Sequence, residues 1–347
     1  MLANTGDRPS RLRQSQKEVR GMGSTLLEKP EMGWDEDETS NEVRVERPMT
    51  KTGKGTQKIL RDTFRTQSIG LSNADFVVVG WMAAMHLGCL VAPFFFTWSA
   101  LGVCLAFYWL TGTVGVTLGY HRYLAHRSFK LSRPAEFFVY MLGVLSMQGS
   151  PLMWAATHRV HHARSDKDGD PHSPRHGKWW SHMIWLLIDN HRSKDPVFVN
   201  KVCPDLVKDP MIQFFEKTFV WWTVAFGIAM LAIGGLPWLL WGLCVRVVIT
   251  YHATWFVNSA THLWGYRTYE TGDDSRNLWW VALVTGGEGW HNNHHAYPRV
   301  ARAGHQWWEF DTTYGVILLL KSLGQAWDVN DKLPDATRKG TPKLAKS

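Results

Sequence analysis

The chain alternates between polar segments and long apolar blocks that carry no charged residue. No Asp, Glu, Lys or Arg occurs between Asp75 and His121, and none occurs between Lys217 and Arg246. A membrane-spanning helix needs roughly 20 apolar residues. The first block has room for two such helices, and the second, which continues with apolar residues to about His262, has room for two more.

Each block is interrupted near its middle by residues that break helices. Pro93 interrupts the first, and the sequence Gly234-Gly235-Leu236-Pro237 interrupts the second. Because proline and glycine end helices or turn the chain, we expect two helical hairpins. The predicted spans cover about 75–93, 97–119, 218–234 and 238–261.

Two polar residues fall inside these spans. Arg246 interrupts the fourth span, and a charge at that depth must find a partner, face a cavity or extend to the membrane boundary. His86 lies within the first span, where we expect a polar contact between helices.

The distribution of basic residues predicts the topology. Both hairpin turns, 92–98 and 233–238, lack Lys and Arg, whereas the N-terminal segment, residues 120–217 and the C-terminal part are rich in them. Basic loops favour the cytosol-like side of a membrane, so these three parts should share that side. Two shorter apolar stretches, 137–149 and 179–188, fit helices on the membrane surface.

The predicted fold is therefore an all-α integral membrane protein. Four transmembrane helices form two hairpins, and a cytosol-side helical cap covers them. Residues 71–330 form this membrane domain. Residues 1–70 are predicted to be polar and largely disordered, with an organelle-targeting part at their basic start, and residues 331–347 to be a loose polar tail.

Composition supports a membrane partner over nucleic acid. The chain has 38 Lys and Arg against 30 Asp and Glu, a balance that suits either nucleic acid or an anionic membrane surface. The uncharged blocks and the 20 tryptophans, which favour membrane boundaries, indicate the membrane. No nucleic-acid partner is expected. The four cysteines form no C-x-x-C pair and do not suggest a disulfide framework.

Half of the sixteen histidines lie in three short clusters, which the predicted topology places on one side of the membrane. Residues three and four apart share a helical face, so the H-x-x-H-H clusters could each present three imidazoles to one point. The H-x4-H cluster does not fit an α-helical face, so we expect the second span to unwind there. The histidines are His121, His126, His158, His161, His162, His291, His294 and His295.

Imidazole is a ligand for Fe, Zn, Cu and Ni, and eight nitrogens exceed the ligands of one ion, so we expect two ions. Redox iron beside a bilayer indicates oxygen chemistry on lipid. A zinc or nickel carrier is the non-enzyme alternative, but carriers need polar residues along an intramembrane path. Carboxylates should orient the ligand imidazoles, and the candidates are Asp166, Asp168, Asp170, Glu288 and Asp311.

Several motifs resemble those of the membrane-bound fatty-acyl desaturases of the delta-9 type, in particular the cyanobacterial and plastid-type enzymes. They are G-Y-H-R-Y-L-A-H-R-S-F (119–129), T-H-R-V-H-H-A-R-S-D (157–166), D-P-H-S-P (170–174), N-S-A-T-H-L-W-G-Y-R (258–267) and G-E-G-W-H-N-N-H-H-A-Y-P (287–298).

The resemblance implies a two-iron centre that uses dioxygen to introduce a cis double bond into a saturated acyl chain. It adds His262 as a ninth ligand and Asn258 as a contact through water. It also implies a bent substrate tunnel whose kink is formed by Gln148, Trp154, Thr254 and Trp255. A membrane diiron hydroxylase is the nearest alternative enzyme.

One departure from the animal enzymes bears on the substrate. Those enzymes carry Arg-Asp just before the second cluster, where the pair helps to hold coenzyme A, whereas this chain has Ala155-Ala156-Thr157. The resemblance therefore favours a glycerolipid-bound acyl chain over acyl-CoA, with the double bond at position nine or seven.

Electrons must come from a partner, because the chain has no H-P-G-G stretch typical of a fused cytochrome b5. Ferredoxin fits the favoured plastid or cyanobacterial-type membrane, and cytochrome b5 fits the alternative, the endoplasmic reticulum. The basic residues Lys178, Arg192, Lys194 and Lys201 could steer an acidic donor or meet anionic head groups.

Overall fold

The structure is a computed structural model, and it describes residues 70–189, 195–333 and 343–345. Almost all regular structure in these residues is helical, apart from two short antiparallel strands, β1 (Lys130–Leu131) and β2 (Ala326–Trp327). The predictions for residues 1–69, for most of the C-terminal tail and for Arg192 and Lys194 lie outside the described residues.

The first apolar block forms two long helical stretches with a break at the predicted place. Helix α2 (Phe76–Val91) begins after Asp75, whose side chain accepts a hydrogen bond from the Val78 backbone N–H. The 3-10 helix η1 (Ala92–Phe95), which contains Pro93, and then Thr97 separate α2 from α3 (Trp98–Trp109). The stretches Phe76–Phe95 and Trp98–Ala125 are both long and apolar enough to cross a membrane.

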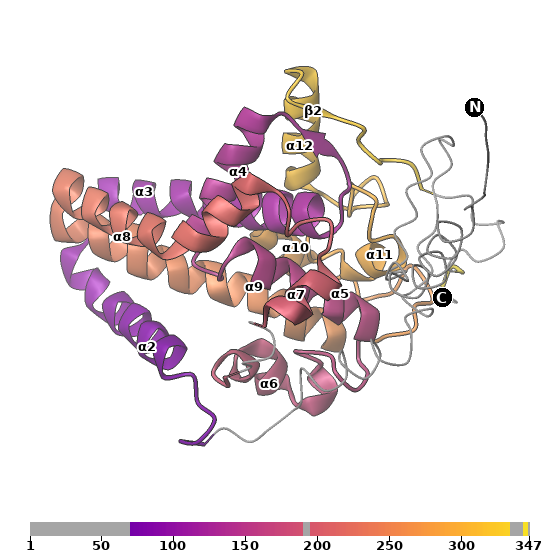
Figure 1. The fold of residues 1–347 in the computed structure, drawn as a ribbon, viewed down its shortest axis with the longest axis horizontal. Coiled ribbons are helices and arrows are strands. Elements are labelled where there is room, and N and C mark those ends of the chain that lie inside the picture. Colours follow the sequence, from indigo (N-terminus) through magenta and orange to yellow (C-terminus); the bar gives the residue numbers. More distant parts are fainter. Residues whose placement is uncertain (1–69, 190–194, 334–342, 346–347) are drawn as a thin grey trace, which may run out of the picture.

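The second apolar block forms the third such stretch, Pro210–Leu263, which contains α8 (Pro210–Leu239), the π-helix η6 (Leu240–Val245) and α9 (Arg246–Leu263). Gly235 interrupts it with φ 64° and ψ −158°, a conformation that glycine adopts readily. The chain reverses there, so α8 and α9 lie side by side (Figure 1), and Trp238 packs against Phe226 and Met230. The predicted break at residues 234–237 is confirmed.

The end of the second span differs from the prediction. Helix α3 continues without unwinding as a π-helix, η2 (Leu110–Ala125), well beyond residue 119. In a π-helix each N–H bonds to the carbonyl five residues earlier, and the His126 N–H accordingly donates to the His121 carbonyl at 3.1 Å. The expectation that the chain unwinds at this cluster is therefore wrong.

The remaining helices form a cap at one end of the long apolar helices (Figure 1). The predicted helices at 137–149 and 179–188 correspond to α4 and to α6 with η4, whereas η3, α7, α10 and α12 were not predicted. The cap elements are α4 (Arg133–Leu145), α5 (Pro151–Arg164), η3 (Pro174–His176), α6 (Lys178–His182), η4 (Ile184–Leu186), α7 (Pro196–Val202), α10 (Trp279–Thr285), α11 (His291–Ala296) and α12 (Thr312–Ser322).

The largest hydrophobic cluster lies where η2, α4, α5 and α8 meet, and its fully buried members include Leu118, Tyr120, Tyr140 and Phe215. Helix η2 approaches α4 closely at Gly115, where a Cβ atom would lie 2.5 Å from the Leu142 carbonyl oxygen. This contact fixes η2, and with it the first histidine cluster, against the cap.

Arg246 is fully buried and is held by neutral oxygen atoms. Its Nε donates to the Gly242 carbonyl at 3.0 Å, and its Nη1 donates to the Leu145 carbonyl at 2.6 Å and to Thr111 Oγ1 at 3.3 Å. Buried charges require such compensation. Arg246 therefore joins α9 to η2 and to the end of α4.

Three further histidines form a row between α2, α9 and α6. His86 Nε2 lies 3.3 Å from His252 Nε2, and His252 Nδ1 lies 3.0 Å from His182 Nε2. The row ends at the Met82 carbonyl, 2.7 Å from His86 Nδ1, and at Ser259 Oγ, 3.0 Å from His182 Nδ1. The predicted contact of His86 between helices is confirmed.

Candidate metal centre

The histidines of the three clusters, together with His262, form two groups suited to hold metal ions. Within each group the potential ligand atoms all lie within 4.8 Å of one another. The first group is His121, His126, His158, His162 and His294, and the second is His161, His262, His291 and His295.

Each H-x-x-H-H helix divides its imidazoles between the two groups. On α5, His158 and His162 face the first group and His161 faces the second; on α11, His294 faces the first while His291 and His295 face the second. In each helix the first and third histidines, at positions i and i+4, point to the same group, and the second, at i+3, points to the other group. The expectation of three imidazoles at one point is therefore wrong, and the split places the two groups side by side.

The π-helix explains how the H-x4-H cluster joins the first group. Its i→i+5 hydrogen bonding aligns residues five apart, and the rings of His121 and His126 accordingly lie 4.8 Å apart, centroid to centroid. In an α-helix these positions would point in different directions.

The ring nitrogens converge in a way that suits a cation. In the first group, His294 Nε2 lies 3.0 Å from His121 Nε2 and 2.9 Å from His162 Nε2. In the second, the Nε2 atoms of His291 and His262 lie 3.1 Å apart. A neutral imidazole carries only one N–H, so His294 can donate to at most one of its two neighbours. Lone pairs that converge from several buried imidazoles fit a metal ion.

Carboxylates contact the outer nitrogen of one imidazole in the first group and of three in the second. Such partners fix the tautomer of a ligand histidine. Asp170 Oδ1 lies 3.0 Å from His161 Nδ1, and Asp166 Oδ2 lies 2.9 Å from His262 Nδ1. Glu288 Oε2 lies 2.8 Å from His121 Nδ1. Three of the five predicted carboxylates therefore contact the histidines.

The other two predicted carboxylates do not contact the histidines, and one carboxylate that does contact them was not predicted. Asp168 is exposed. Asp311 accepts hydrogen bonds from Arg122, which also donates to Glu288, so Asp311 lies one step further from the site. Asp273 was not predicted, although its Oδ2 lies 2.7 Å from His295 Nδ1. It follows no histidine motif, and only its position in the acidic stretch T-G-D-D-S marked it in the sequence.

Burial determines the protonation states of the site. Burial, reinforced by neighbouring imidazoles, lowers the pKa of His126, His158 and His162 well below the ordinary value, so these side chains are neutral at pH 7. Burial alone would raise the pKa of Asp170, but the adjacent His161 lowers it to about 2. Burial opposes the charged form of His161 as well, but the adjacent Asp170 carboxylate raises the pKa of that imidazole above its ordinary value. Metal binding requires neutral imidazoles and ionised carboxylates.

The two asparagines of H-N-N-H-H hold α11 in place. Asn292 Oδ1 accepts hydrogen bonds from the backbone N–H groups of Thr268 and Tyr269, both at 2.8 Å. Asn293 Nδ2 donates to Glu309 Oε2 at 2.8 Å. The sequence between the histidines therefore fixes the helix that carries them.

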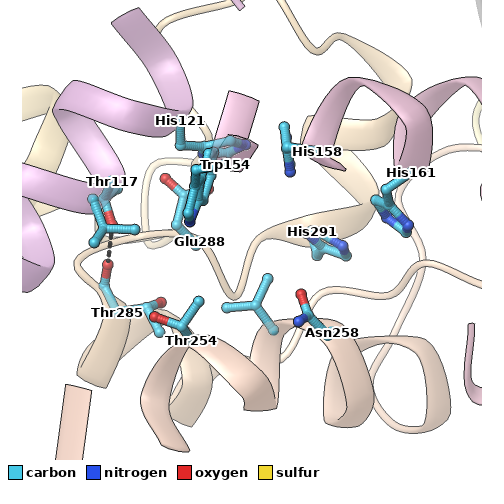
Figure 2. A pocket seen from close by; sticks show the side chains of 12 residues that line it. Thr117, His121, Trp154, His158, His161, Thr254, Asn258, Thr285, Glu288 and His291 are labelled. Atoms are coloured by element: carbon cyan, nitrogen blue, oxygen red, sulfur yellow. Dashed lines mark hydrogen bonds and ion pairs between the residues drawn. The ribbon is translucent and has the colours of Figure 1, made fainter. Parts of the chain in front are cut away.

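A pocket lies directly beside the histidines (Figure 2). The predicted tunnel residues Trp154 and Thr254 and the predicted water contact Asn258 line it together with histidines of both groups. Figure 2 shows these side chains around the same space. The other lining residues are Val116, Thr117, His121, His158, His161, Val257, Thr285, Glu288 and His291.

The two remaining tunnel residues lie differently. Gln148 Nε2 donates to Thr254 Oγ1 at 2.8 Å, and Gln148 Oε1 accepts from Trp154 Nε1 at 3.3 Å, so Gln148 ties together two residues of the pocket. Trp255 is buried against Tyr251 and His182 and is not among the residues that line this pocket.

Comparison with known proteins agrees with this geometry. Residues 96–314 match the fatty acid desaturase family. The chain is 47% identical over 253 residues to the sn-1 stearoyl-lipid 9-desaturase of Anabaena variabilis, covering 72% of this chain and 91% of that protein. It is 44% identical over 268 residues to the chloroplastic palmitoyl-monogalactosyldiacylglycerol delta-7 desaturase of Arabidopsis thaliana, covering 76% and 71%.

An acyl-CoA 5-desaturase of Anemone leveillei is also similar, with 42% identity over 274 residues that cover 77% of this chain and 83% of the relative. Similar sequences thus include enzymes named for lipid-bound and for CoA-bound acyl chains. The chain belongs to the fatty acid desaturase family, and it is a desaturase.

Proposed function

We propose that this protein is an acyl-lipid desaturase that introduces a cis double bond, at position nine or seven, into a saturated acyl chain of a glycerolipid. The observation that carries the proposal is the pair of buried histidine groups directly beside a pocket. The relatives named as lipid 9- and delta-7 desaturases support the substrate class.

The histidines of the first group would hold one iron and those of the second group the other. Two histidine-bound irons would supply the redox chemistry by which dioxygen is reduced to water while two hydrogens leave the acyl chain. Asp166, Asp170, Asp273 and Glu288 keep the imidazoles oriented through their outer nitrogens. Asn258, which lines the pocket between Thr254 and His262 on α9, would bind a water molecule beside the metal.

The pocket walls would select the site of attack. Val116 and Val257 offer apolar surface to an acyl chain and keep bulk water away from the reacting carbons. The hydrogen bonds from Trp154 through Gln148 to Thr254 hold two further lining residues in place. A chain held between these walls would present one pair of carbons to the site, which accounts for a double bond at one position.

The glycerolipid substrate rests partly on α5. Ala155, Ala156 and Thr157 stand where the animal enzymes carry the Arg-Asp pair; the two alanines are fully buried and Thr157 is half-buried. At these positions the chain offers no charge to the phosphates of coenzyme A. Lipid-bound chains need no such contact.

The proposed topology has four membrane spans. The reversal at Gly235 divides the stretch Pro210–Leu263 into two antiparallel helices, which with Phe76–Phe95 and Trp98–Ala125 make two hairpins. An even number of spans returns the chain to one side, the side on which the cap carries the histidines. The cyanobacterial and chloroplastic relatives favour a plastid or cyanobacterial-type membrane, with the endoplasmic reticulum as the alternative.

A separate protein would supply the electrons, with ferredoxin favoured in such a membrane and cytochrome b5 as the alternative. Lys178 is exposed and Lys201 is half-buried. Both are available to an acidic donor, and electrostatic attraction of this kind mainly raises the association rate.

Expression in a yeast that lacks its own desaturase tests the function. Fatty acids resolved by lipid class and double-bond position should show new monounsaturated chains that appear first in glycerolipids. Unsaturation that appears first in the acyl-CoA pool would refute the lipid substrate, and hydroxylated chains without double bonds would refute desaturation. His161→Ala should abolish the products, whereas His176→Ala, at an exposed histidine outside both groups, should retain them.

Metal analysis of the purified protein tests the cofactor separately. About two irons per chain are expected from the two groups. Protein that holds about one zinc and no iron would instead support a carrier or sensor.

A further inference from the structure

The short helix α10 has a strongly apolar outer face that the proposed chemistry does not use. Trp279 is 64% exposed and Leu283 is 66% exposed, and they lie four residues apart on one side of the helix. Val281 and Ala282, on the other side, are buried. A tryptophan and a leucine exposed together suit a lipid boundary better than water.

The contacts of α10 place it beside the membrane-crossing helices. Tyr108 donates its hydroxyl hydrogen to the Val284 carbonyl, and Thr117 Oγ1 donates to the Thr285 carbonyl at 3.1 Å. Both donors belong to the apolar stretch Trp98–Ala125. Tyr108 precedes His121 by thirteen residues and Thr117 precedes it by four, so the end of α10 lies alongside the last part of the span and reaches the turn before the first histidine group.

The lipid-facing surface of that stretch continues onto α10. Leu105 and Trp109 flank Tyr108 on α3, and both are exposed, as Leu283 and Val284 are on α10. On its other side α10 packs through Val281 against Ala260 of α9. Helix α10 therefore lies across the space between η2 and α9, with its outer face continuous with a membrane-facing surface.

The end of the same helix forms part of the pocket wall. Thr285 lines the pocket together with Thr117 of η2 and Thr254 of α9, and Figure 2 shows the three side chains close together at one end of that space. Only one residue separates the exposed Leu283 from Thr285. Helix α10 is thus the thin wall between the outer apolar surface and the space beside the histidines.

We propose that Trp279 and Leu283 contact bilayer lipid, and that the acyl chain of a membrane lipid reaches the pocket sideways past α10, between η2 and α9. This inference rests on the proposed function and adds the route by which the substrate enters. A lipid that enters in this way keeps its head group at the membrane boundary, so its acyl chain need not leave the bilayer before it reaches the site.

The first test asks only whether α10 touches lipid. A diazirine-bearing amino acid is placed at Leu283, at Leu105 as a positive control, or at the exposed Lys167 of the cap as a negative control, in the full chain reconstituted in phosphatidylcholine bilayers. Illumination should yield lipid adducts at Leu283 and Leu105 but not at Lys167. Adducts at Leu105 without any at Leu283 would overturn the proposal.

The second test asks whether the substrate uses this route. Leu283→Asp should lower kcat/KM for bilayer lipid by roughly tenfold, leaving iron content and turnover of detergent-dispersed lipid unchanged. Val197→Asp, at a similarly exposed aliphatic residue of α7, should change neither kcat/KM for bilayer lipid nor turnover of dispersed lipid. Equal losses for bilayer and dispersed lipid would refute the route. If the wild-type protein desaturates no lipid, the proposed function fails, while the adducts still report on α10.

Discussion

The contact between Asp273 and His295 offers a sharp test of the metal centre. Asp273 Oδ2 lies 2.7 Å from His295 Nδ1. Burial opposes the charge on this carboxylate, but the adjacent His295 holds the pKa of Asp273 well below its ordinary value. The ionised Asp273 therefore accepts the Nδ1 proton of His295 and leaves Nε2 free to bind a metal.

Asp273→Asn should reverse this arrangement with little change to the loop. Asp273 Oδ1 accepts hydrogen bonds from Ser275 N and Ser275 Oγ, and an asparagine oxygen can accept the same bonds. Its NH2 group would then face His295 Nδ1. Two donors cannot share a hydrogen bond, so Nδ1 should lose its proton and Nε2, 3.3 Å from His161 Nε2, should gain one.

The expected cost is roughly 10–100-fold in metal affinity, the range found when outer partners of ligand histidines are removed. This corresponds to about 1.4–2.7 kcal/mol. Asp274→Asn is the matched control. Asp274 pairs with Arg175 at 2.7 Å at the surface, where both side chains are largely exposed and such pairs contribute little.

The assay is anaerobic titration of metal-free protein with ferrous iron against a competing chelator. Asp273→Asn should bind more weakly, and Asp274→Asn should match the wild type. The reasoning is refuted if Asp273→Asn binds iron within twofold of the wild type, or if Asp274→Asn loses as much affinity.

Three further predictions concern stability and product. The pKa values of His126, His158 and His162 are lowered in the folded chain. Below about pH 6.5 the unfolded chain therefore binds protons that the folded chain does not. Metal-free protein should lose stability as the pH falls, by up to about 1.4 kcal/mol per pH unit for each histidine. Thermal melts from pH 7.5 to 5.5 measure this, and a constant Tm would contradict it. Gly287→Ala should lower the free energy of unfolding by about 1–3 kcal/mol, because Gly287 has φ 126° and a Cβ atom would lie 2.6 Å from Asp311 Oδ1. Chemical denaturation would measure this loss, and Gly272→Ala, at a position with open space, is the control. Thr254→Val removes the 2.8 Å bond from Gln148 and should broaden the double-bond positions among the products, and an unchanged distribution by mass spectrometry would argue against a positioning role.

The hairpins were predictable because their signals are local and strong. A long uncharged block leaves few alternatives to membrane spans, and Pro93 and Gly235 mark the breaks. The histidine clusters were equally visible, because their spacing is itself the signal. Geometry that depends on the backbone hydrogen-bond pattern was not visible. The residues that lead up to His121 carry no charge, and their pattern does not distinguish a π-helix from an α-helix.

Contacts made across the fold were also hidden. Asp273 reaches His295 from a loop 22 residues away, and no spacing rule connects the two. Helix α10 has only seven residues and was too short to stand out as an apolar segment. Its significance comes from Tyr108 and Thr117, which the sequence places far from it.

The row of histidines between α2 and α6 has a direction. The Met82 carbonyl can only accept, so His86 must hold its proton on Nδ1. His252 must then donate through Nε2, and His182 through its own Nε2.

Ser259 completes the row by turning its single hydroxyl proton toward His182 Nδ1. The same hydroxyl can instead donate to the Trp255 carbonyl, 2.8 Å away. In that rotamer His182 Nδ1 faces an oxygen without a hydrogen between them, and the row loses its last hydrogen bond. The rotation of one serine hydroxyl thus sets whether every nitrogen of three linked neutral imidazoles has a partner.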